Sequence, residues 1–235
     1  MASLEYLRRK VQTRIRDFDR KLVQPAEIDA ILNEAQDRFT KETDYVLSTL
    51  IVDIVADQAL YELSTPGYKI GRIQTVKVYD GSTDSWVVLP VSVEKLDALD
   101  SDWRNRTSAR PWYYVRNYTP STSLSVKGAS IWLYPTPTTT YSSGLRITTS
   151  LITDNALVAD GSESVVGEWD EALVNYAVAE AMIRCALQKD PEVAKTYMGQ
   201  AEIYRRRFEE DLLNAAVKGK TGYDRAFGTT KTQFQ

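Results

Sequence analysis

The sequence contains no histidine, and its 235 residues include a single cysteine. The absence of histidine removes the commonest general base, the commonest metal ligand and every Ser-His catalytic triad. Cys185 alone cannot form an intramolecular disulfide or supply a thiolate zinc site. These absences exclude the enzyme classes that depend on such groups, and we expect no catalytic residues, no metal and no cofactor.

Long hydrophobic runs are also missing. Apolar runs such as Leu50-Ile51-Val52 end after a few residues, far short of the ~20 apolar residues that span a bilayer. The N-terminus lacks the apolar core of a signal peptide. We therefore expect a soluble protein made in the cytoplasm, without a membrane partner. The composition, with 43% hydrophobic and 26% charged residues, is that of a globular protein, and the net charge of −3 argues against a general nucleic-acid coat.

The strongest periodic pattern lies in the C-terminal third, residues 166–217. Apolar residues recur three, four or seven positions apart, which predicts two amphipathic helices separated at Lys189-Asp190-Pro191. Pro191 suits a first helical turn, because its missing N–H would be unpaired there anyway. The predicted buried stripes are Trp169, Leu173, Tyr176, Ile183 and Leu187, then Val193, Tyr197, Ala201, Tyr204, Phe208, Leu212 and Ala215.

Two further helices are predicted in residues 4–42, one over residues 4–16 and one that Pro25 opens and that ends near Lys41. The polar face of the first helix is basic and carries Arg8, Arg9, Lys10, Arg14 and Arg16. One interpretation is an ordinary solvated helix surface. The other is contact with phosphate or with an acidic neighbouring subunit, through Arg8, Arg9, Lys10 and Arg14.

From residue 45 to residue 152 the period changes from 3.6 to about 2, which predicts an inserted β region. Residues 47–55 and 59–63 are predicted to form one hairpin, and residues 73–79 and 86–90 another, which turns at Asp80-Gly81. Ser92 is expected to cap a short helix over residues 93–99. Strands are also predicted over residues 111–118, 129–134 and 145–151.

This order of elements indicates an α+β fold. The N- and C-terminal helices form a helical platform that carries a mostly antiparallel sheet of six or seven strands. We expect residues 1–217 to form a single domain.

Residues 218–235 show neither a helical stripe nor strand alternation, and they are predicted to form a flexible C-terminal arm. The arm is basic, with Lys218, Lys220, Arg225 and Lys231 against one acidic residue, Asp224. It is either a frayed terminus or a segment that becomes ordered on a partner.

Three motifs resemble chemical sites but are better explained otherwise. Gly219-Lys220-Thr221 matches the end of a P-loop, but Asn214 replaces the earlier glycine and a helix precedes it instead of a strand. Asp97, Asp100 and Asp102 lack the spacing of a cation loop. Arg110-Pro111-Trp112-Tyr113-Tyr114 mixes arginine with aromatics as single-strand binders do, but the same pattern is typical of one face of a sheet.

Several short motifs follow one another in the order found in phage head–tail connector adaptors. They are Leu32-Asn33-Glu34-Ala35, Thr43-Asp44, Tyr61-Glu62-Leu63, Pro90-Val91-Ser92-Val93-Glu94-Lys95-Leu96, Pro111-Trp112-Tyr113-Tyr114 and Leu133-Tyr134-Pro135-Thr136-Pro137. The sequence thus resembles this family over roughly residues 5–215. It departs from the family at Ala109-Arg110-Pro111, where a Gly-x-Pro is usual.

The resemblance implies a non-enzymatic structural virion protein. It would form a twelve-fold ring beneath the portal protein and join it to the tail or to a second neck protein. DNA would pass through the lumen during packaging and ejection without sequence-specific binding. We hypothesise that the C-terminal arm binds the portal through Tyr223, Arg225, Phe227 and Phe234, since aromatic and arginine residues are enriched among interface anchors. The alternative is a nucleic-acid-binding module that uses the basic N-terminal helix.

Overall fold

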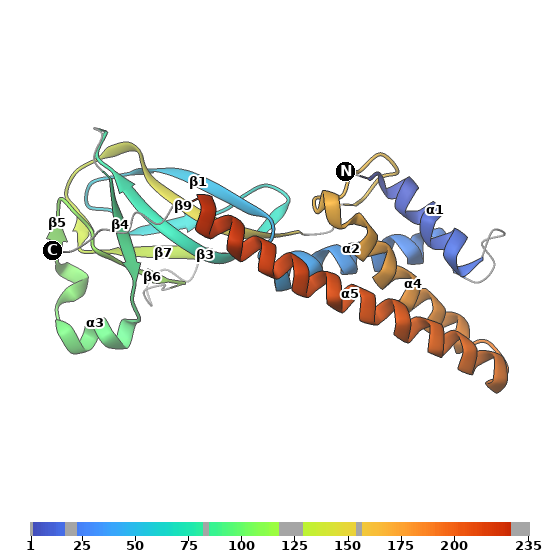
Figure 1. Ribbon diagram of the computed structural model, residues 1–235. Helices are drawn as coiled ribbons and strands as arrows, with labels where there is room; N and C mark the ends of the chain where they lie inside the picture. Colours follow the sequence, from blue (N-terminus) through green and yellow to red (C-terminus); the bar gives the residue numbers. More distant parts are fainter. Residues whose placement is uncertain (1, 17–22, 82–84, 118–128, 154–156, 227–235) are drawn as a thin grey trace. The chain divides into compact units, whose positions relative to one another are not determined.

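The structure, a computed structural model, describes residues 2–16, 23–81, 85–117, 129–153 and 157–226 (Figure 1). The chain divides into two compact units, which we call the helical unit (Met1–Val46 and Ile152–Gln235) and the sheet unit (Leu47–Leu151). The helices and the mostly antiparallel seven-stranded sheet confirm the predicted α+β fold class. The grouping of residues 1–217 into a single domain stays a prediction.

Each helix of the helical unit starts where the sequence provides a suitable first turn. The elements are α1 (Leu4–Ile15), α2 (Pro25–Thr43), η2 (Gly167–Trp169), α4 (Asp170–Ala186) and α5 (Pro191–Ala226). The Ser3 side chain caps α1 by accepting a hydrogen bond from the Tyr6 N–H. The Glu27 carboxylate accepts a hydrogen bond from the Gln24 N–H, 2.9 Å away, at the start of α2. No helix in the described part of the chain is long and apolar enough to cross a membrane.

The last helix is longer than predicted. α5 continues to Ala226, whereas the sequence pattern placed its end at Val217. Extending an existing helix gains one backbone hydrogen bond per residue, which offsets the low helix propensity of Gly219 and Gly222. The backbone of residues 218–226 is therefore helical, and the remainder of the predicted arm, residues 227–235, lies outside the described residues.

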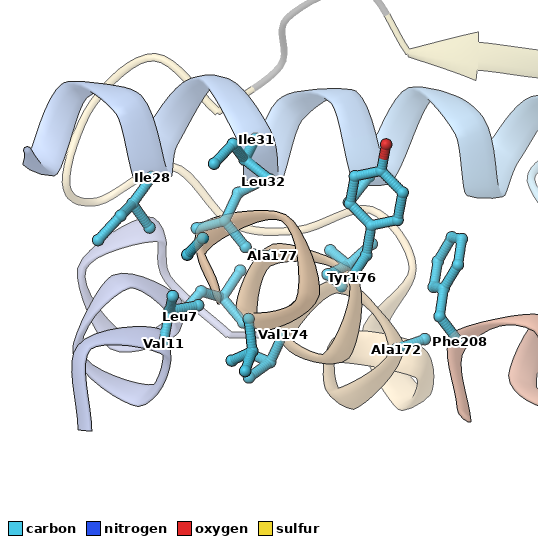
Figure 2. Packing of buried hydrophobic residues seen from close by; sticks show 14 of the residues in the cluster. Leu7, Val11, Ile28, Ile31, Leu32, Ala172, Val174, Tyr176, Ala177 and Phe208 are labelled. Carbon is cyan, nitrogen blue, oxygen red and sulfur yellow. The ribbon is translucent and has the colours of Figure 1, made fainter. Parts of the chain in front are cut away.

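The core of the helical unit is one cluster of buried side chains from α1, α2, α4 and α5 (Figure 2). Leu7, Leu32 and Phe208 are fully buried in it, and the Phe208 ring lies 4.9 Å from the Tyr176 ring, centroid to centroid. The predicted stripes are wrong at Leu187 and Val193, which are 82% and 44% exposed. Both residues lie beside the turn between α4 and α5, where the side chains no longer face the neighbouring helix.

Buried polar side chains join α2 to the chain that leads into α4. The Asn33 amide donates to the Leu157 carbonyl at 2.9 Å and accepts from the Leu157 N–H at 3.0 Å. The Gln36 Oε1 accepts a hydrogen bond from the Val165 N–H at 3.0 Å. These bonds satisfy backbone groups that no regular element pairs.

The sheet unit contains seven strands in the order β1-β9-β3-β4-β6-β7-β2, with a separate two-stranded pairing of β5 and β8. The elements are β1 (Leu47–Ile54), β2 (Leu60–Leu63), β3 (Tyr68–Tyr79), β4 (Ser85–Pro90), α3 (Val93–Leu99), η1 (Trp103–Asn105), β5 (Thr107–Ser108), β6 (Tyr113–Arg116), β7 (Ala129–Tyr134), β8 (Thr136–Pro137) and β9 (Tyr141–Thr153). All pairs in the larger sheet with a described register are antiparallel except β4 with β6.

One predicted hairpin is confirmed and the other is wrong. β3 and β4 pair with Val76 opposite Val88, as expected. β1 and β2, however, form opposite edges of the sheet, where β1 pairs with β9 and β2 pairs with β7. The turn between them is held by the β8–β9 region, because the Asp57 N–H donates to the Pro137 carbonyl at 2.7 Å. The alternation of apolar and polar residues shows which face of a strand is buried, but it does not show which strand pairs with it.

The inward side chains of all seven strands meet in one cluster, so the sheet curves around its own core. The Tyr61 hydroxyl accepts from the Val55 N–H at 3.2 Å and thereby joins β2 to the end of β1, the other edge strand. The predicted cap of α3 is confirmed, since the Ser92 side chain accepts a hydrogen bond from the Lys95 N–H. Leu96 of α3 packs with Trp103 and Val115 in a small separate cluster.

Candidate interaction surfaces

The basic residues of α1 are paired with carboxylates of the same chain. Arg8 holds Asp29 of α2 with two hydrogen bonds, both 2.7 Å long, and its Nη1 lies 2.9 Å from an Asp160 carboxylate oxygen. The hydrogen bond to Asp29 raises the pKa of the Arg8 guanidinium despite the opposing effect of burial. Arg8 therefore fixes α1 against α2, because a bidentate arginine–carboxylate pair restricts both partners.

Lys10 and Arg14 converge on one carboxylate, that of Glu171 in α4. The Lys10 Nζ lies 2.9 Å from Glu171, and Arg14 contacts both Glu171 and the Asn175 side-chain oxygen, the latter at 2.9 Å. Although burial pushes the pKa of Glu171 upward, the hydrogen bonds from Arg14 and Lys10 bring it below the usual value. The remaining predicted residue, Arg9, pairs with Glu5 one turn earlier at 2.6 Å and keeps 75% of its side chain exposed.

These pairs leave little uncompensated charge on the predicted basic face. A surface built to bind phosphate gains its affinity from cations that are free to replace counterions. Here Arg8, Lys10 and Arg14 contact carboxylates of α2, α4 or the loop at Asp160. The role of Arg8, Arg9, Lys10 and Arg14 in phosphate or subunit contact stays a prediction. No sequence pattern indicates the partners Asp29 and Glu171, because the pairing depends on how the helices pack.

The predicted anchors of the C-terminal arm fall in two places. Tyr223 and Arg225 belong to the last turns of α5, so the helix sets their backbone. Phe227 and Phe234 lie outside the described residues. The portal-binding role of all four stays a prediction.

The acidic residues at the end of α3 serve as internal hydrogen-bond acceptors. Asp97 accepts from the Trp103 indole N–H at 2.7 Å and from Arg104 at 2.8 Å, while Asp100 accepts from the Arg106 Nε at 2.7 Å. The hydrogen bond from Arg104 lowers the pKa of Asp97, and the one from Arg106 lowers that of Asp100. Among the described residues no cluster of three or more His, Cys, Asp or Glu side chains could hold a metal ion.

The arginine-aromatic motif before β6 forms part of the sheet. Tyr114 is buried in the core of the sheet unit, and Tyr113 stacks on Tyr134 with ring centroids 6.4 Å apart. Arg110 lies over the Trp86 ring, 5.0 Å from its centroid. Of the aromatic side chains in the motif, only Trp112 is largely exposed, at 56%. The aromatic side chains thus mostly stabilise the sheet, in agreement with the prediction that the motif forms one face of a sheet.

The helical unit also contains a pocket that the sequence analysis missed. It lies between the end of α1, α4 and the first half of α5, has a volume of about 580 Å³, and is lined by Arg14, Arg16, Tyr197, Gln200, Tyr204 and Arg207 together with apolar side chains. The sequence signals were Arg14 and Arg16, which belong to the predicted basic face. Arg207 lies in α5, and nothing in the sequence pattern indicates that it comes close to Arg14 and Arg16 of α1.

Comparison with known proteins supports the resemblance seen in the motifs. No curated protein matches the chain. A family model described as SU10 adaptor protein matches residues 3–232, which includes both units and most of the C-terminal segment. The chain therefore belongs to the SU10 adaptor protein family, a family of structural phage head–tail adaptors.

Proposed function

We propose that this protein is the head-to-tail adaptor that forms a ring beneath the portal, connects the capsid to the tail and leaves a channel for DNA. Its partners are the portal protein, the tail or a second neck protein, and further copies of itself in a twelve-fold ring. Its place is the virion, at the head–tail connector, and it acts without catalysis. The family match over residues 3–232 carries this proposal.

The charge distribution supports a channel through which DNA slides. A lumen that held phosphates tightly would retard packaging and ejection, because each neutralised phosphate adds to the affinity. The chain is mildly acidic, at −3, and the basic residues of α1 contact internal carboxylates. Duplex DNA is therefore expected to pass without sequence-specific contacts.

The test of assembly is sedimentation with and without the portal. A ring needs contacts that each bury more than about 1,000 Å² to be stable unaided. We expect the free protein to sediment as a monomer and the mixture with portal to contain a larger species, which negative-stain images show as a ring. A closed dimer under both conditions would contradict the proposal.

We propose that the C-terminal segment binds the portal through Tyr223, Arg225, Phe227 and Phe234. Two truncations separate its helical part from the rest, one ending at Val217 and one ending at Ala226. If the segment anchors the ring, ending the chain at Val217 abolishes portal docking and leaves the melting temperature of the free protein nearly unchanged. Docking by the longer truncation shows whether Phe227 and Phe234 are needed. Full docking by the shorter one would contradict the assignment.

The competing function is nucleic-acid binding through α1. Strong binding to free duplex DNA that weakens steeply with salt would favour it. The carboxylate partners of Arg8, Lys10 and Arg14 argue against such binding. A matched substitution pair, Arg9→Ala for the exposed cation and Arg8→Ala for the partly buried one, distinguishes the two functions. A nucleic-acid surface loses DNA affinity mainly with Arg9→Ala.

A further inference from the structure

We propose that the pocket between α1, α4 and α5 binds a carboxylate-bearing segment of a partner protein, with an apolar side chain next to the acidic one. We call it the arginine pocket, and define it by Arg14, Arg16 and Arg207 with Tyr197, Gln200 and Tyr204. Among the described residues, no acidic side chain lines it. The binding site is independent of ring formation, so it can be tested on the isolated protein.

The charges of this pocket differ from those on the rest of α1. In the part of the chain that the structure describes, neither Arg16 nor Arg207 makes an ion pair. Of the three arginines only Arg14 is paired within the described ranges. Its partner is Glu171, which also pairs with Lys10. The pocket therefore has an excess of guanidinium groups, which match a carboxylate with paired hydrogen bonds.

The structure around the pocket restricts where the arginines can lie, through an aromatic ring beside two of them and a fixed backbone at the third. Tyr204 is half-buried against the helical core, and the guanidinium carbons of Arg14 and Arg207 lie 6.0 and 5.6 Å from its ring centroid. Arg16 ends α1 in a left-handed conformation at φ 57°, and its N–H is bonded to carbonyls of the last turn. Fixing the donors before binding reduces the entropy lost when a ligand enters.

The remaining lining favours a protein segment over a nucleic acid. Ile15, Met182 and Ile203 place apolar surface beside the arginines, and Tyr197 adds an aromatic ring. Duplex DNA carries one charge per ~1.7 Å along a convex rod, and its phosphates have no apolar side chain beside them to fill a concave pocket. Tyrosine and arginine around a pocket are, by contrast, the residue types enriched at the energetic centre of protein interfaces.

The direct test is fluorescence anisotropy with a labelled peptide that alternates glutamate and leucine, and with the same peptide carrying glutamine for glutamate. We expect the wild-type protein to prefer the glutamate peptide by about tenfold or more, because hydrogen bonds to charged groups are the strong ones. Arg207→Glu and Arg16→Glu each remove that preference. Arg206→Glu is the matched control, since Arg206 is the exposed neighbour of Arg207 on α5 and does not line the pocket.

Arg207→Gln, which removes the charge without reversing it, keeps the test valid if Arg207→Glu fails to fold, and circular dichroism confirms the fold of each variant. The proposal is overturned if the two peptides bind equally or if Arg206→Glu weakens binding as much as Arg207→Glu. It is also overturned if a short DNA duplex binds more tightly than the glutamate peptide and depends on Arg207. Failure of portal docking, with peptide binding intact, would contradict the proposed function and leave the arginine pocket standing.

Discussion

The helical unit and the sheet unit are stabilised in different ways. The helical unit has one large buried cluster, and ion pairs such as Arg38 with Glu209, 2.7 Å apart, join helices that are distant in the sequence. The sheet unit relies on hydrogen-bonded pairs of strands that are distant in the sequence, such as β1 with β9, around a smaller core. Helices satisfy their own backbone hydrogen bonds, so their packing can be altered without loss of secondary structure, whereas a strand depends on its partner. The following substitutions test this contrast.

The largest effect is expected in the helical core. Phe208→Ala should lower the free energy of unfolding by roughly 3–5 kcal/mol, because the side chain is fully buried and its removal leaves a cavity. Denaturation followed by the helical circular-dichroism signal, which comes mainly from the helical unit, measures it. Arg206→Ala, on the exposed face of α5, should cost under ~1 kcal/mol. Equal melting temperatures for the two variants would mean that the buried face of α5 is misassigned.

The matching substitution in the sheet core is Leu133→Ala in β7. Leu133 is fully buried, and its loss should cost roughly 2–5 kcal/mol, while Leu89→Ala, at a position 53% exposed, should cost much less. If the two units unfold separately, Leu133→Ala leaves the transition of the helical circular-dichroism signal unchanged. A shift of that transition as large as the one caused by Phe208→Ala would show that the units unfold together.

The same contrast explains which parts of the fold the sequence could predict. The starts of α1, α2 and α5 follow from local features, since Ser3 caps a first turn and Pro25 and Pro191 each begin one. The β3–β4 hairpin was also predictable from Asp80-Gly81, because a short turn fixes its two neighbouring strands. The pairing of β1 with β9 was not predictable, because their residues are about a hundred positions apart and alternation names no partner.

The candidate sites were less predictable than the fold. A helical pattern shows that Arg8 and Arg14 lie on a polar face, but their carboxylate partners come from α2 and α4. The arginine pocket depends in the same way on the packing of α1 and α5 against α4, which brings Arg16 and Arg207 to one cavity. The family resemblance, by contrast, was found from short motifs alone, and the family match confirms it.

An intermediate effect is expected where a buried side chain pairs with backbone. Asn33→Ala removes both hydrogen bonds to Leu157 and leaves a buried N–H and carbonyl without a side-chain partner. The expected cost is about 1–3 kcal/mol, measured by urea denaturation. Asn105→Ala, on an exposed residue of η1, is the control and should change stability little. If Asn33→Ala lowers the free energy of unfolding no more than the control does, water replaces the Asn33 amide without loss of stability.

The smallest effect, and the one that depends on pH, is expected for Glu171→Gln. The pKa of Glu171 is lowered in the folded protein, so its ion pairs with Lys10 and Arg14 stabilise the fold above the pKa of the unfolded chain, about 4.3. That contribution is lost as the pH falls through the lower folded value, because protonation then removes the charge. Since Glu171 is half-exposed, the difference from wild type should stay under ~1 kcal/mol near pH 7 and shrink at high salt. Thermal melts in low salt from pH 7 down to about 3 measure it. A difference between variant and wild type that is constant over this range would show that Glu171 acts through packing, and the ion pairs joining α1 to α4 would then contribute no stability.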